Sequence, residues 1–402
     1  MKILFLTLIV PYPPDAGPRI KTWNVLKYLA EQGYSITLLT FVRKDEEKHL
    51  PHLKRICEKV IPIPIRRTKI RDVLSMISSQ LRGTPFLIER DYRPEMALIL
   101  KKLLQEEIFN VVHIDQVNMA QFVVNQDNIH ISSKTIFDAH NATWAILDRM
   151  RSQVPLFFRP LVTLEAKKLK KYEYRLVKQV DHVLTVTEID RDLLLEKPGD
   201  PEVSSKVHVL PIAVNTQEIQ SIVRKKGSQQ ILTIGSLNYP PNADGVRWFL
   251  RDVFPLIKEK NAKATLTVIG KNPPKDFYHL AAPFGDDIQI KGYVDDLTPY
   301  LEDSALMVVP VLAGSGMRVR ILEAFARGIP VVTTTIGLEG IAAENGREVL
   351  VEDDPVSFAE VVLNLLENPV QQQTLAENAR ELVTKLYDWK VVLKKLDRIY
   401  QI

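Results

Sequence analysis

The stretch LMVVPVLAGSGMRVRILEAF at residues 306–325 decides the fold class. It begins with a short apolar run, passes through a loop of small residues, and ends in a segment with the apolar spacing of a helix. A buried strand that leads through a loop into a helix is the unit from which parallel α/β sheets are built. The sequence therefore predicts an α/β protein, and we expect the same pattern on both sides of this stretch.

Short apolar runs of strand length recur along the chain, with helical stretches between them. The expected strands lie at residues 3–10, 35–41, 60–63, 111–114, 135–137, 183–186 and 207–210, and at 231–234, 265–269, 288–291, 306–310, 330–333 and 348–351. The segment 243–258 carries a helical apolar stripe. We therefore expect two α/β domains, at residues 1–212 and 213–386, followed by a helix at 387–402 that is suited to pack on either.

The composition excludes several classes of protein. Apolar residues make up 46% and charged residues 25% of 402 residues, as in folded globular domains. The single cysteine, Cys57, excludes an internal disulfide and a multi-cysteine zinc site, and indicates a reducing compartment. The apolar run at 3–10 is short for a signal peptide, and no run reaches the length of a membrane-spanning helix.

Charge is distributed unevenly along the chain. Residues 1–200 contain 31 Lys and Arg against 24 Asp and Glu, whereas the remainder contains 22 against 25. The first half is therefore basic and the second slightly acidic. Such an asymmetry suggests an anionic partner for the first half, either nucleic acid or a membrane surface.

The loop at 310–320 has the properties of a phosphate-binding loop. Its small residues leave backbone N–H groups accessible where a helix begins, and the helix dipole favours an anion there. Arg318 and Arg320 add positive charge. Val319 replaces the third glycine of G-x-G-x-x-G, and no Walker lysine–serine pair is present, so neither named fingerprint applies. A purely structural loop is the alternative.

Two further loops contain candidate site residues. In residues 11–19, Gly17 would allow close backbone approach to a ligand, and a plain strand-to-helix turn explains it equally well. In residues 137–143, His140 suits proton transfer because imidazole titrates near neutrality, with a capping or packing histidine as the open alternative. Asp115 and Gln116 follow the preceding strand at the same sheet edge and are candidates to bind an acceptor hydroxyl.

Other motifs favour structural explanations. Asp190-Arg191-Asp192 matches a metal-binding D-x-D pattern, but Thr187 three residues before Asp190 makes a helix cap the simpler account. No zinc-protease, zinc-finger or serine-hydrolase motif is present, so we expect no metal site. The basic clusters at 66–71 and 167–175 lack a nucleic-acid module around them.

A series of motifs in the second half resembles glycosyltransferase family 4, the GT-B-fold "group 1" enzymes. The motifs occur in the family's order, at residues 234–236 (IGS), 241–245 (PNADG), 268–270 (VIG), 292–296 (GYVDD), 314–318 (GSGMR), 322–324 (LEA), 328–332 (GIPVV) and 335–340 (TIGLEG). Residues 11–19 and 138–141 resemble the corresponding loops of the first domain. The chain is most similar to bacterial sugar transferases of envelope and exopolysaccharide pathways.

The resemblance implies two Rossmann-like domains, with mostly parallel sheets, that face each other across a cleft. It implies that the last helix, 387–402, returns to the first domain. The implied reaction moves a sugar from a nucleoside diphosphate sugar to an acceptor hydroxyl, with retention of configuration and without a metal or other cofactor. His140 would lie beside the reacting sugar, and Glu323 would bind the ribose hydroxyls.

The resemblance also implies a set of binding positions. Those on the donor side are Gly17, Arg19, Gly235, Ser236, Asn242, Tyr293, Val294, Gly314, Ser315, Gly316, Met317, Arg318, Val319, Arg320 and Glu323. Asn141 joins Asp115 and Gln116 on the acceptor side. This chain departs from the family at three of these positions, because Ser315 replaces a glutamate, and Ser236 and Asn242 replace the arginine and lysine that often hold the pyrophosphate. We therefore expect Arg318, as a catalytic group, and Arg320 to supply the missing positive charge.

With this resemblance the charge asymmetry favours a membrane surface. The Lys and Arg clusters of the acceptor-side domain would approach anionic lipid head groups and a lipid-linked or glycan acceptor, and nucleic acid drops out as a partner. We expect a cytoplasmic protein that binds peripherally to the inner face of the membrane. Two alternatives stay open: a GT-B-fold sugar-nucleotide epimerase, which needs no acceptor, and a non-catalytic nucleotide-sugar-binding homologue.

Overall fold

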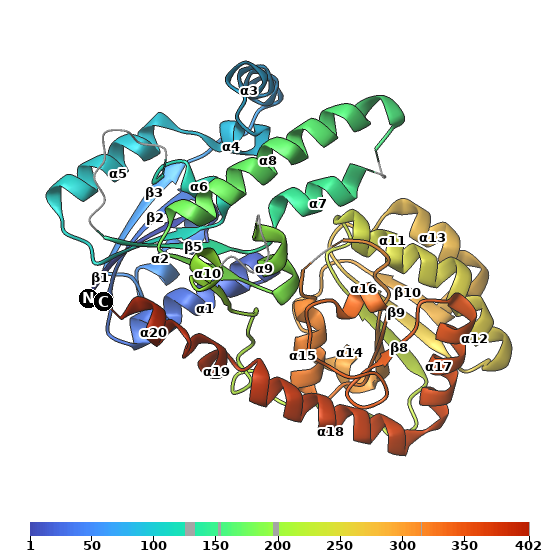
Figure 1. The fold of residues 1–402 in the computed structure, drawn as a ribbon. Coiled ribbons are helices and arrows are strands. Elements are labelled where there is room, and N and C mark those ends of the chain that lie inside the picture. Colours follow the sequence, from blue (N-terminus) through green and yellow to red (C-terminus); the bar gives the residue numbers. More distant parts are fainter. Residues whose placement is uncertain (125–132, 152–153, 196–200, 315, 402) are drawn as a thin grey trace. The chain divides into compact units, whose positions relative to one another are not determined.

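The computed structural model describes residues 1–124, 133–151, 154–195, 201–314 and 316–401, and it contains two compact units (Figure 1). The first unit consists of Met1–Ile212 together with the segment that begins at Val392. The second unit is Ala213–Val391. Each unit has a parallel sheet and a hydrophobic core of its own.

The first unit is built on a seven-stranded sheet with the order β3-β2-β1-β4-β5-β6-β7. Its strands are β1 (Lys2–Thr7), β2 (Ser35–Val42), β3 (Lys59–Pro64), β4 (Val111–Asp115), β5 (Lys134–Ala139), β6 (His182–Thr185) and β7 (Val207–Val209). Its helices are α1 (Gly17–Glu31), α2 (Leu50–Leu53), α3 (Lys69–Arg82), α4 (Phe86–Asp91), α5 (Pro94–Glu106), α6 (Val117–Ala120), α7 (Thr143–Met150), α8 (Arg159–Gln179), α9 (Glu188–Leu194), α10 (Pro201–Ser204) and α20 (Leu396–Tyr400). The strand order reverses between β1 and β4, and in open α/β sheets ligands bind beyond the carboxyl ends of the strands at such a point.

The second unit has a six-stranded sheet with the order β10-β9-β8-β11-β12-β13. Its strands are β8 (Gln230–Ile234), β9 (Thr265–Ile269), β10 (Ile288–Lys291), β11 (Ser304–Val309), β12 (Val331–Thr333) and β13 (Leu350–Val351). Its helices are α11 (Pro240–Trp248), α12 (Phe254–Lys260), α13 (Lys275–Ala281), α14 (Thr298–Asp303), α15 (Val319–Arg327), α16 (Thr335–Leu338), α17 (Pro355–Glu367) and α18 (Pro369–Leu386). Here the order reverses between β8 and β11, which places the loops after these two strands at the expected ligand-binding edge.

The thirteen expected strands are all present, and the strand pairings are parallel. Parallel sheets covered by helices on both faces bury both sides of their strands, which is why these runs are continuously apolar rather than alternating. The central strands β4 and β11 are buried along their whole length. The α/β prediction is therefore confirmed.

The helix expected at 243–258 is present but not uniform. It consists of α11 and α12 joined by a π-helical turn at Phe249–Val253. Gly245 lies within α11, where an added Cβ would come 1.5 Å from the Pro310 carbonyl oxygen. Glycine is required here because α11 packs directly on the backbone that follows β11.

The end of the chain forms two short helices rather than the single helix expected at 387–402. The first, α19 (Trp389–Leu393), carries the chain from the second unit into the first. The second, α20, packs on α1, where the Tyr28 hydroxyl donates a hydrogen bond to the Asp397 carboxylate at 2.7 Å. Its last residue, Tyr400, is completely buried in the first unit.

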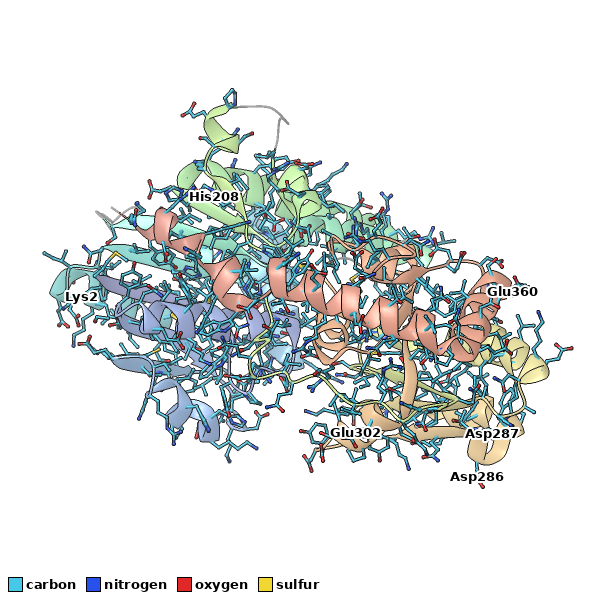
Figure 2. The ribbon with its side chains drawn as sticks, turned by 90° about the horizontal axis from the view of Figure 1, so that it is seen from below. Lys2, His208, Asp286, Asp287, Glu302 and Glu360 are labelled. Carbon is cyan, nitrogen blue, oxygen red and sulfur yellow. The ribbon has the colours of Figure 1, made fainter. Side chains whose placement is uncertain are left out.

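Acidic side chains lie on the outer surface of the second unit. Figure 2 shows Asp286, Glu302 and Glu360 there, on three separate elements, and each is exposed. The excess of acidic residues in this half is thus partly a surface property. Among the described residues, no helix combines the length and the apolar character needed to cross a membrane.

Candidate functional site

The site in the first unit begins with the register of its central strands. Thr7 of β1 pairs with Asp115 of β4, and Asp115 pairs with Asp138 of β5. These residues end or nearly end their strands, so their side chains meet beyond the sheet edge at the point where the strand order reverses. All three are completely buried.

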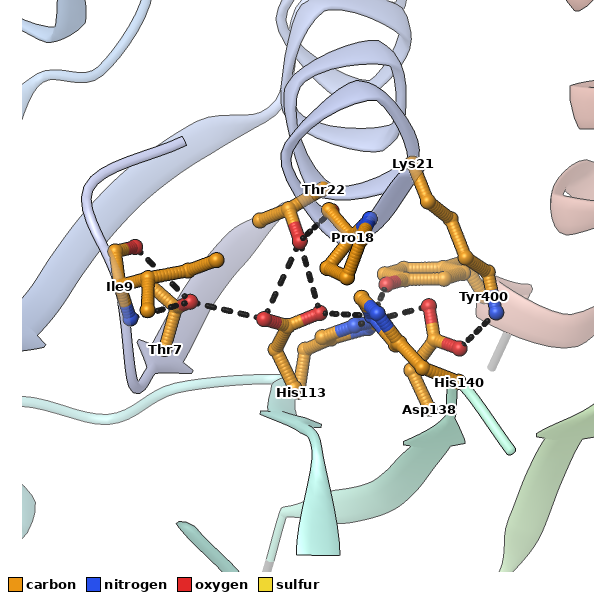
Figure 3. A network of polar contacts seen from close by, with 10 residues as sticks. Thr7, Ile9, Pro18, Lys21, Thr22, His113, Asp138, His140 and Tyr400 are labelled. Carbon is orange, nitrogen blue, oxygen red and sulfur yellow. Dashed lines mark hydrogen bonds and ion pairs between the residues drawn. The ribbon is translucent and has the colours of Figure 1, made fainter. Parts of the chain in front are cut away.

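His140 is held by Asp115. Its Nε2 lies 2.7 Å from Asp115 Oδ1 (Figure 3). The Thr7 hydroxyl donates to Asp115 Oδ2 at 2.7 Å, and the Thr22 hydroxyl of α1 lies 3.1 Å from both carboxylate oxygens. Burial alone would raise the pKa of Asp115, but the charge of His140 and the hydrogen bonds from His140 and Thr7 lower it below its usual value. Asp115 therefore stays ionised and fixes the orientation of the His140 ring.

This arrangement corrects the expectation that Asp115 binds an acceptor hydroxyl. The carboxylate is completely buried, and both of its oxygens already accept hydrogen bonds. Gln116 is half-buried and has a left-handed backbone with φ 72°, and its N–H donates to the Asp138 carbonyl at 3.0 Å. Asn141 is half-buried in the turn that follows His140. The structure thus makes Asp115 a positioning residue for His140.

A second set of buried polar side chains lies beside this pair. The Lys21 ammonium of α1 forms an ion pair with Asp138, and both side chains are almost completely buried. His113 lies with its Nδ1 2.5 Å from the Tyr400 hydroxyl and its Nε2 3.7 Å from Asp138 (Figure 3). Burial lowers the pKa of His113 to about 4, against the opposing effect of Asp138, so this ring is neutral near pH 7. A neutral ring that accepts the Tyr400 proton at Nδ1 carries its own proton on Nε2, toward Asp138.

The turn after His140 is anchored from two sides. Asp190 accepts the backbone N–H of Ala142 at 3.0 Å and the hydroxyl of Thr187 at 2.6 Å. Thr187 in turn caps α9 by accepting the N–H of Asp190, as its spacing predicts, so Asp190 has a structural role. Glu173 of α8 is completely buried and accepts the first two N–H groups of α7. These contacts fix the backbone that carries His140.

Arg19 does not offer a free positive charge to a donor. Its guanidinium pairs with Asp15, in the loop that joins β1 to α1, at 2.9 Å, and with Glu46, in the segment after β2, at 2.8 Å. Gly17 is the first residue of α1 and is half-buried. Arg19 therefore stabilises this loop, and its contact with a donor stays a prediction.

In the second unit, the loop after β11 is shaped by two glycines and one arginine. Gly314 and Gly316 have φ of 110° and 84°, which favour glycine. Arg318 donates from Nη1 to the Gly316 carbonyl at 2.7 Å and stands at the N-cap of α15. Ser315, expected to contact the donor, lies outside the described residues. The loop leads into the helix N-terminus as expected.

Arg320 connects this helix to the loop after β8. Its guanidinium donates to the Asn242 side-chain oxygen at 2.9 Å and to the Ile234 carbonyl at 3.2 Å. A Cβ at Gly235 would lie 2.2 Å from Arg320 Nη1, so glycine makes room for the guanidinium. Asn242 also donates to the Ser236 carbonyl at 3.1 Å. Four expected donor positions therefore form one cluster: Arg320, Gly235, Asn242 and, through Asn242, Ser236.

The charges of this site favour an anion. Burial, together with the nearby charge of Arg318, lowers the pKa of Arg320 to about 10, against the opposing charge of Glu323. Two arginines that repel each other at a helix N-terminus would be stabilised by a phosphate. Burial also raises the pKa of the half-buried Glu323, against the opposing charges of Arg327 and Arg320.

The remaining donor-side positions differ in exposure. The side chains of Met317 and Val319 are buried, so only their backbones are available to a ligand. Tyr293 is 64% exposed after β10, where the Lys271 ammonium lies 4.5 Å from the centre of its ring, and Val294 is half-buried.

A protein-family model matches a large part of this second unit. Residues 228–368 match the family described as "Glycosyl transferases group 1". The chain carries a group 1 glycosyltransferase domain. The enzyme class is therefore that of the glycosyltransferases, and the resemblance seen in the motifs of the second half is confirmed.

Other relatives extend over the whole chain. An uncharacterized 44.6 kDa protein in the cps region of Klebsiella pneumoniae is 22% identical over 408 residues, covering 98% of each chain. The sucrose-phosphate synthase structure from Thermosynechococcus elongatus aligns with a TM-score of 0.72 and 16% identity, covering 100% of this chain and 98% of the other. The structure of Anabaena HepE in complex with UDP and glucose aligns with a TM-score of 0.70 and 12% identity, covering 99% of each chain. The fold is therefore the GT-B type, with this glycosyltransferase domain as its second unit.

Several residues of the site were not predicted from the sequence. Lys21 and Thr22 lie in the first turns of the helix that follows β1, and their closeness to the point of strand reversal was an available signal. Tyr400 carries no such signal, because only the return of the chain end brings it to His113. Glu173 is likewise buried beside the site by the packing of α8 on α7.

Proposed function

We propose that this protein transfers a glycosyl group from a nucleoside diphosphate sugar to an acceptor hydroxyl, with retention of configuration and without a metal ion. The observation that carries the proposal is the pair Arg318 and Arg320 at the helix N-terminus of a group 1 glycosyltransferase domain. Positive charge and backbone N–H groups meet there, at the edge where α/β sheets bind ligands. The transferred group leaves a diphosphate, which is the charge that this site is suited to receive.

The reaction needs stabilisation of that leaving group. The bond between the anomeric carbon and the phosphate oxygen breaks, and the diphosphate keeps the electron pair. The acceptor oxygen forms the new bond to the anomeric carbon, and its proton passes to the departing phosphate oxygen. Arg318 and the N–H groups of the loop would bind the charge as it develops, which lowers the barrier more than binding the donor alone.

In this proposal, His140 is the residue of the first unit that lies beside the reacting sugar, as the resemblance implies. Asp115 holds its Nε2, so Nδ1 is the ring nitrogen left to contact a ligand. The anchoring of the following turn by Asp190 and Glu173 keeps this ring in place. Glu323 would accept hydrogen bonds from the ribose hydroxyls of the donor.

The charge balance of the site supports a metal-independent reaction. His113, Asp115 and Asp138 lie close enough to share a cation. However, Asp138 is already paired with the Lys21 ammonium and Asp115 with His140. Both carboxylates thus already have a side-chain partner within the first unit, which supports a reaction without a metal ion.

The relatives suggest the pathway and the first donors to test. One relative lies in a cps region, and the WaaG structure, a glycosyltransferase involved in lipopolysaccharide biosynthesis, aligns with a TM-score of 0.64 and 16% identity, covering 99% of each chain. The Anabaena HepE structure contains UDP and glucose. We therefore propose a role in cell-envelope or exopolysaccharide glycan synthesis in the cytoplasm, on a glycan or lipid-linked acceptor, and UDP-sugars as the first donors.

Calorimetric titration with UDP- and GDP-sugars tests the donor site. Arg320→Gln should weaken binding of the preferred nucleotide sugar by about 10- to 100-fold, since hydrogen bonds to charged groups contribute about 1.5–3 kcal/mol. Arg251→Gln is the matched control, because Arg251 is an exposed arginine of the same unit, paired with its neighbour Asp252. Equal affinity in both variants, or no binding of any nucleotide sugar to the unchanged protein, would overturn the donor site.

Turnover then separates transfer from the alternatives. Arg318→Ala should lower the rate of nucleoside diphosphate release by roughly 10²–10³. His140→Ala should retain donor binding and lose transfer. An NMR time course with donor alone detects epimerisation, and a new sugar nucleotide in that sample would replace this proposal with an epimerase.

A further inference from the structure

Helix α3 exposes its apolar side. Its residues Ile70, Val73, Leu74, Ile77 and Leu81 are 75%, 59%, 61%, 53% and 83% exposed. Their spacing places them on one face of the helix, because residues three, four and seven apart share a face. The 14-residue helix thus carries a continuous aliphatic stripe, here called the α3 apolar face, in contact with water.

The opposite side of α3 is polar and packs on the protein. Ser79 is buried and donates to the Thr84 carbonyl at 2.8 Å, while Ser78 donates to Glu89 of α4 at 2.7 Å. Gln80 donates to Glu165 of α8 at 2.8 Å. Helices at a protein surface normally bury the apolar face and expose the polar one. Because α3 has the opposite orientation, we infer that another molecule covers its apolar face when the protein is active.

The charge around this face is basic. Arg66 and Lys69 are exposed where α3 begins, and Arg82 is exposed at its end. On α8, which contacts α3 through Glu165, Leu161 and Leu164 are also exposed. Figure 1 shows α3 at the periphery of the first unit. An exposed aliphatic stripe with basic residues at both ends matches the chemistry of an interfacial helix on an anionic bilayer.

We propose that the α3 apolar face inserts into the acyl boundary of an anionic membrane leaflet, while Arg66, Lys69 and Arg82 contact the lipid head groups. The basic flanks favour a lipid surface over a second copy of this chain, because a second copy would bring the same positive charges together. This proposal goes beyond the sugar transfer above and specifies which element meets the membrane. The test measures lipid binding and not activity, so the membrane proposal and the proposed sugar transfer can fail independently.

Vesicle sedimentation of the full chain tests the proposal. Vesicles of phosphatidylcholine with an equal amount of phosphatidylglycerol should retain the protein at low salt, and phosphatidylcholine alone should retain far less. The double variant Leu74→Ser/Ile77→Ser should bind at least tenfold more weakly, since each side chain loses the burial gained on insertion. Leu98→Ser/Ile108→Ser is the matched control, because these two aliphatic residues are 70% and 89% exposed in the same unit but outside α3. It should bind like the unchanged protein.

A site-specific probe shows insertion directly. Cys57 is buried, and burial raises the pKa of its thiol to about 12, so a new surface cysteine can be labelled selectively. An environment-sensitive fluorophore on Leu74→Cys should shift to the blue when anionic vesicles are added, and one on Leu98→Cys should not. Equal binding by the Leu74→Ser/Ile77→Ser variant and its control would overturn the proposal. The proposal would also be overturned if the unchanged protein formed a dimer without lipid and the Leu74→Ser/Ile77→Ser variant did not.

Discussion

The buried carboxyl of Glu173 allows a quantitative prediction about pH and stability. Its oxygens accept the N–H groups of Thr143 at 3.0 Å and Trp144 at 2.9 Å, at the start of α7, three residues after His140. Burial raises the pKa of Glu173 to about 7, although these two hydrogen bonds oppose the effect. The folded protein therefore holds a proton that the unfolded chain releases near pH 4.5.

The number of bound protons decides how the free energy of unfolding changes with pH. Between the unfolded and folded pKa values the folded state binds more protons, so its stability falls as pH rises. From the pKa of about 7 in the folded protein, the loss between pH 5 and pH 8 amounts to about 2.5 kcal/mol. Glu173→Gln cannot ionise, so this loss should be absent from the variant. The variant also places an amide N–H₂ toward one backbone N–H, which adds a cost of about 1–3 kcal/mol at every pH.

Urea unfolding at pH 5, 6, 7 and 8 measures the effect. The free energy of unfolding of the unchanged protein should fall by about 2.5 kcal/mol more than that of Glu173→Gln over this range. Glu106→Gln, at an exposed position of α5, is the control and should follow the unchanged protein. Parallel pH profiles for the unchanged protein and Glu173→Gln would refute a raised pKa.

Three further changes have expected outcomes. Tyr400→Phe leaves His113 Nδ1 without its partner and should lower the free energy of unfolding by about 1–3 kcal/mol in urea; an unchanged midpoint would contradict this contact. Gly245→Ala would place a Cβ against the Pro310 carbonyl oxygen and should cost at least about 3 kcal/mol in a thermal melt, because backbone cannot yield as a side chain can. The buried Cys57 thiol should react with an aromatic disulfide reagent only after unfolding, and rapid reaction of the native protein would contradict its burial.

The sequence predicted the strands well because parallel strands buried on both faces are continuous apolar runs. It also predicted the loops of the site, since the carboxyl ends of such strands carry the ligand-binding residues. His140 and the loop before Arg318 are examples. Both follow directly from a strand that periodicity detects.

The partners of these residues were harder to predict because they depend on packing between distant segments. The ion pair of Arg19 with Glu46, which lies 27 residues later, could not be predicted from the loop that contains Arg19. Asp115 was expected to bind an acceptor hydroxyl, and its hydrogen bonds from the hydroxyls of Thr7 and Thr22 were not predicted. The periodicity of α3 similarly shows that an apolar face exists, but only the structure shows that it points to water.

Tyr400 also sets an order of events in synthesis. The strands of the first unit are complete by residue 209, yet its polar cluster takes a hydroxyl from α20. Every residue of the second unit leaves the ribosome before Tyr400 does. The hydrogen bond between His113 and Tyr400 therefore cannot form until the whole glycosyltransferase domain has been translated. A chain interrupted within that domain would carry a first unit with an unfinished cluster. Maturation of the first unit is therefore coupled to completion of the second.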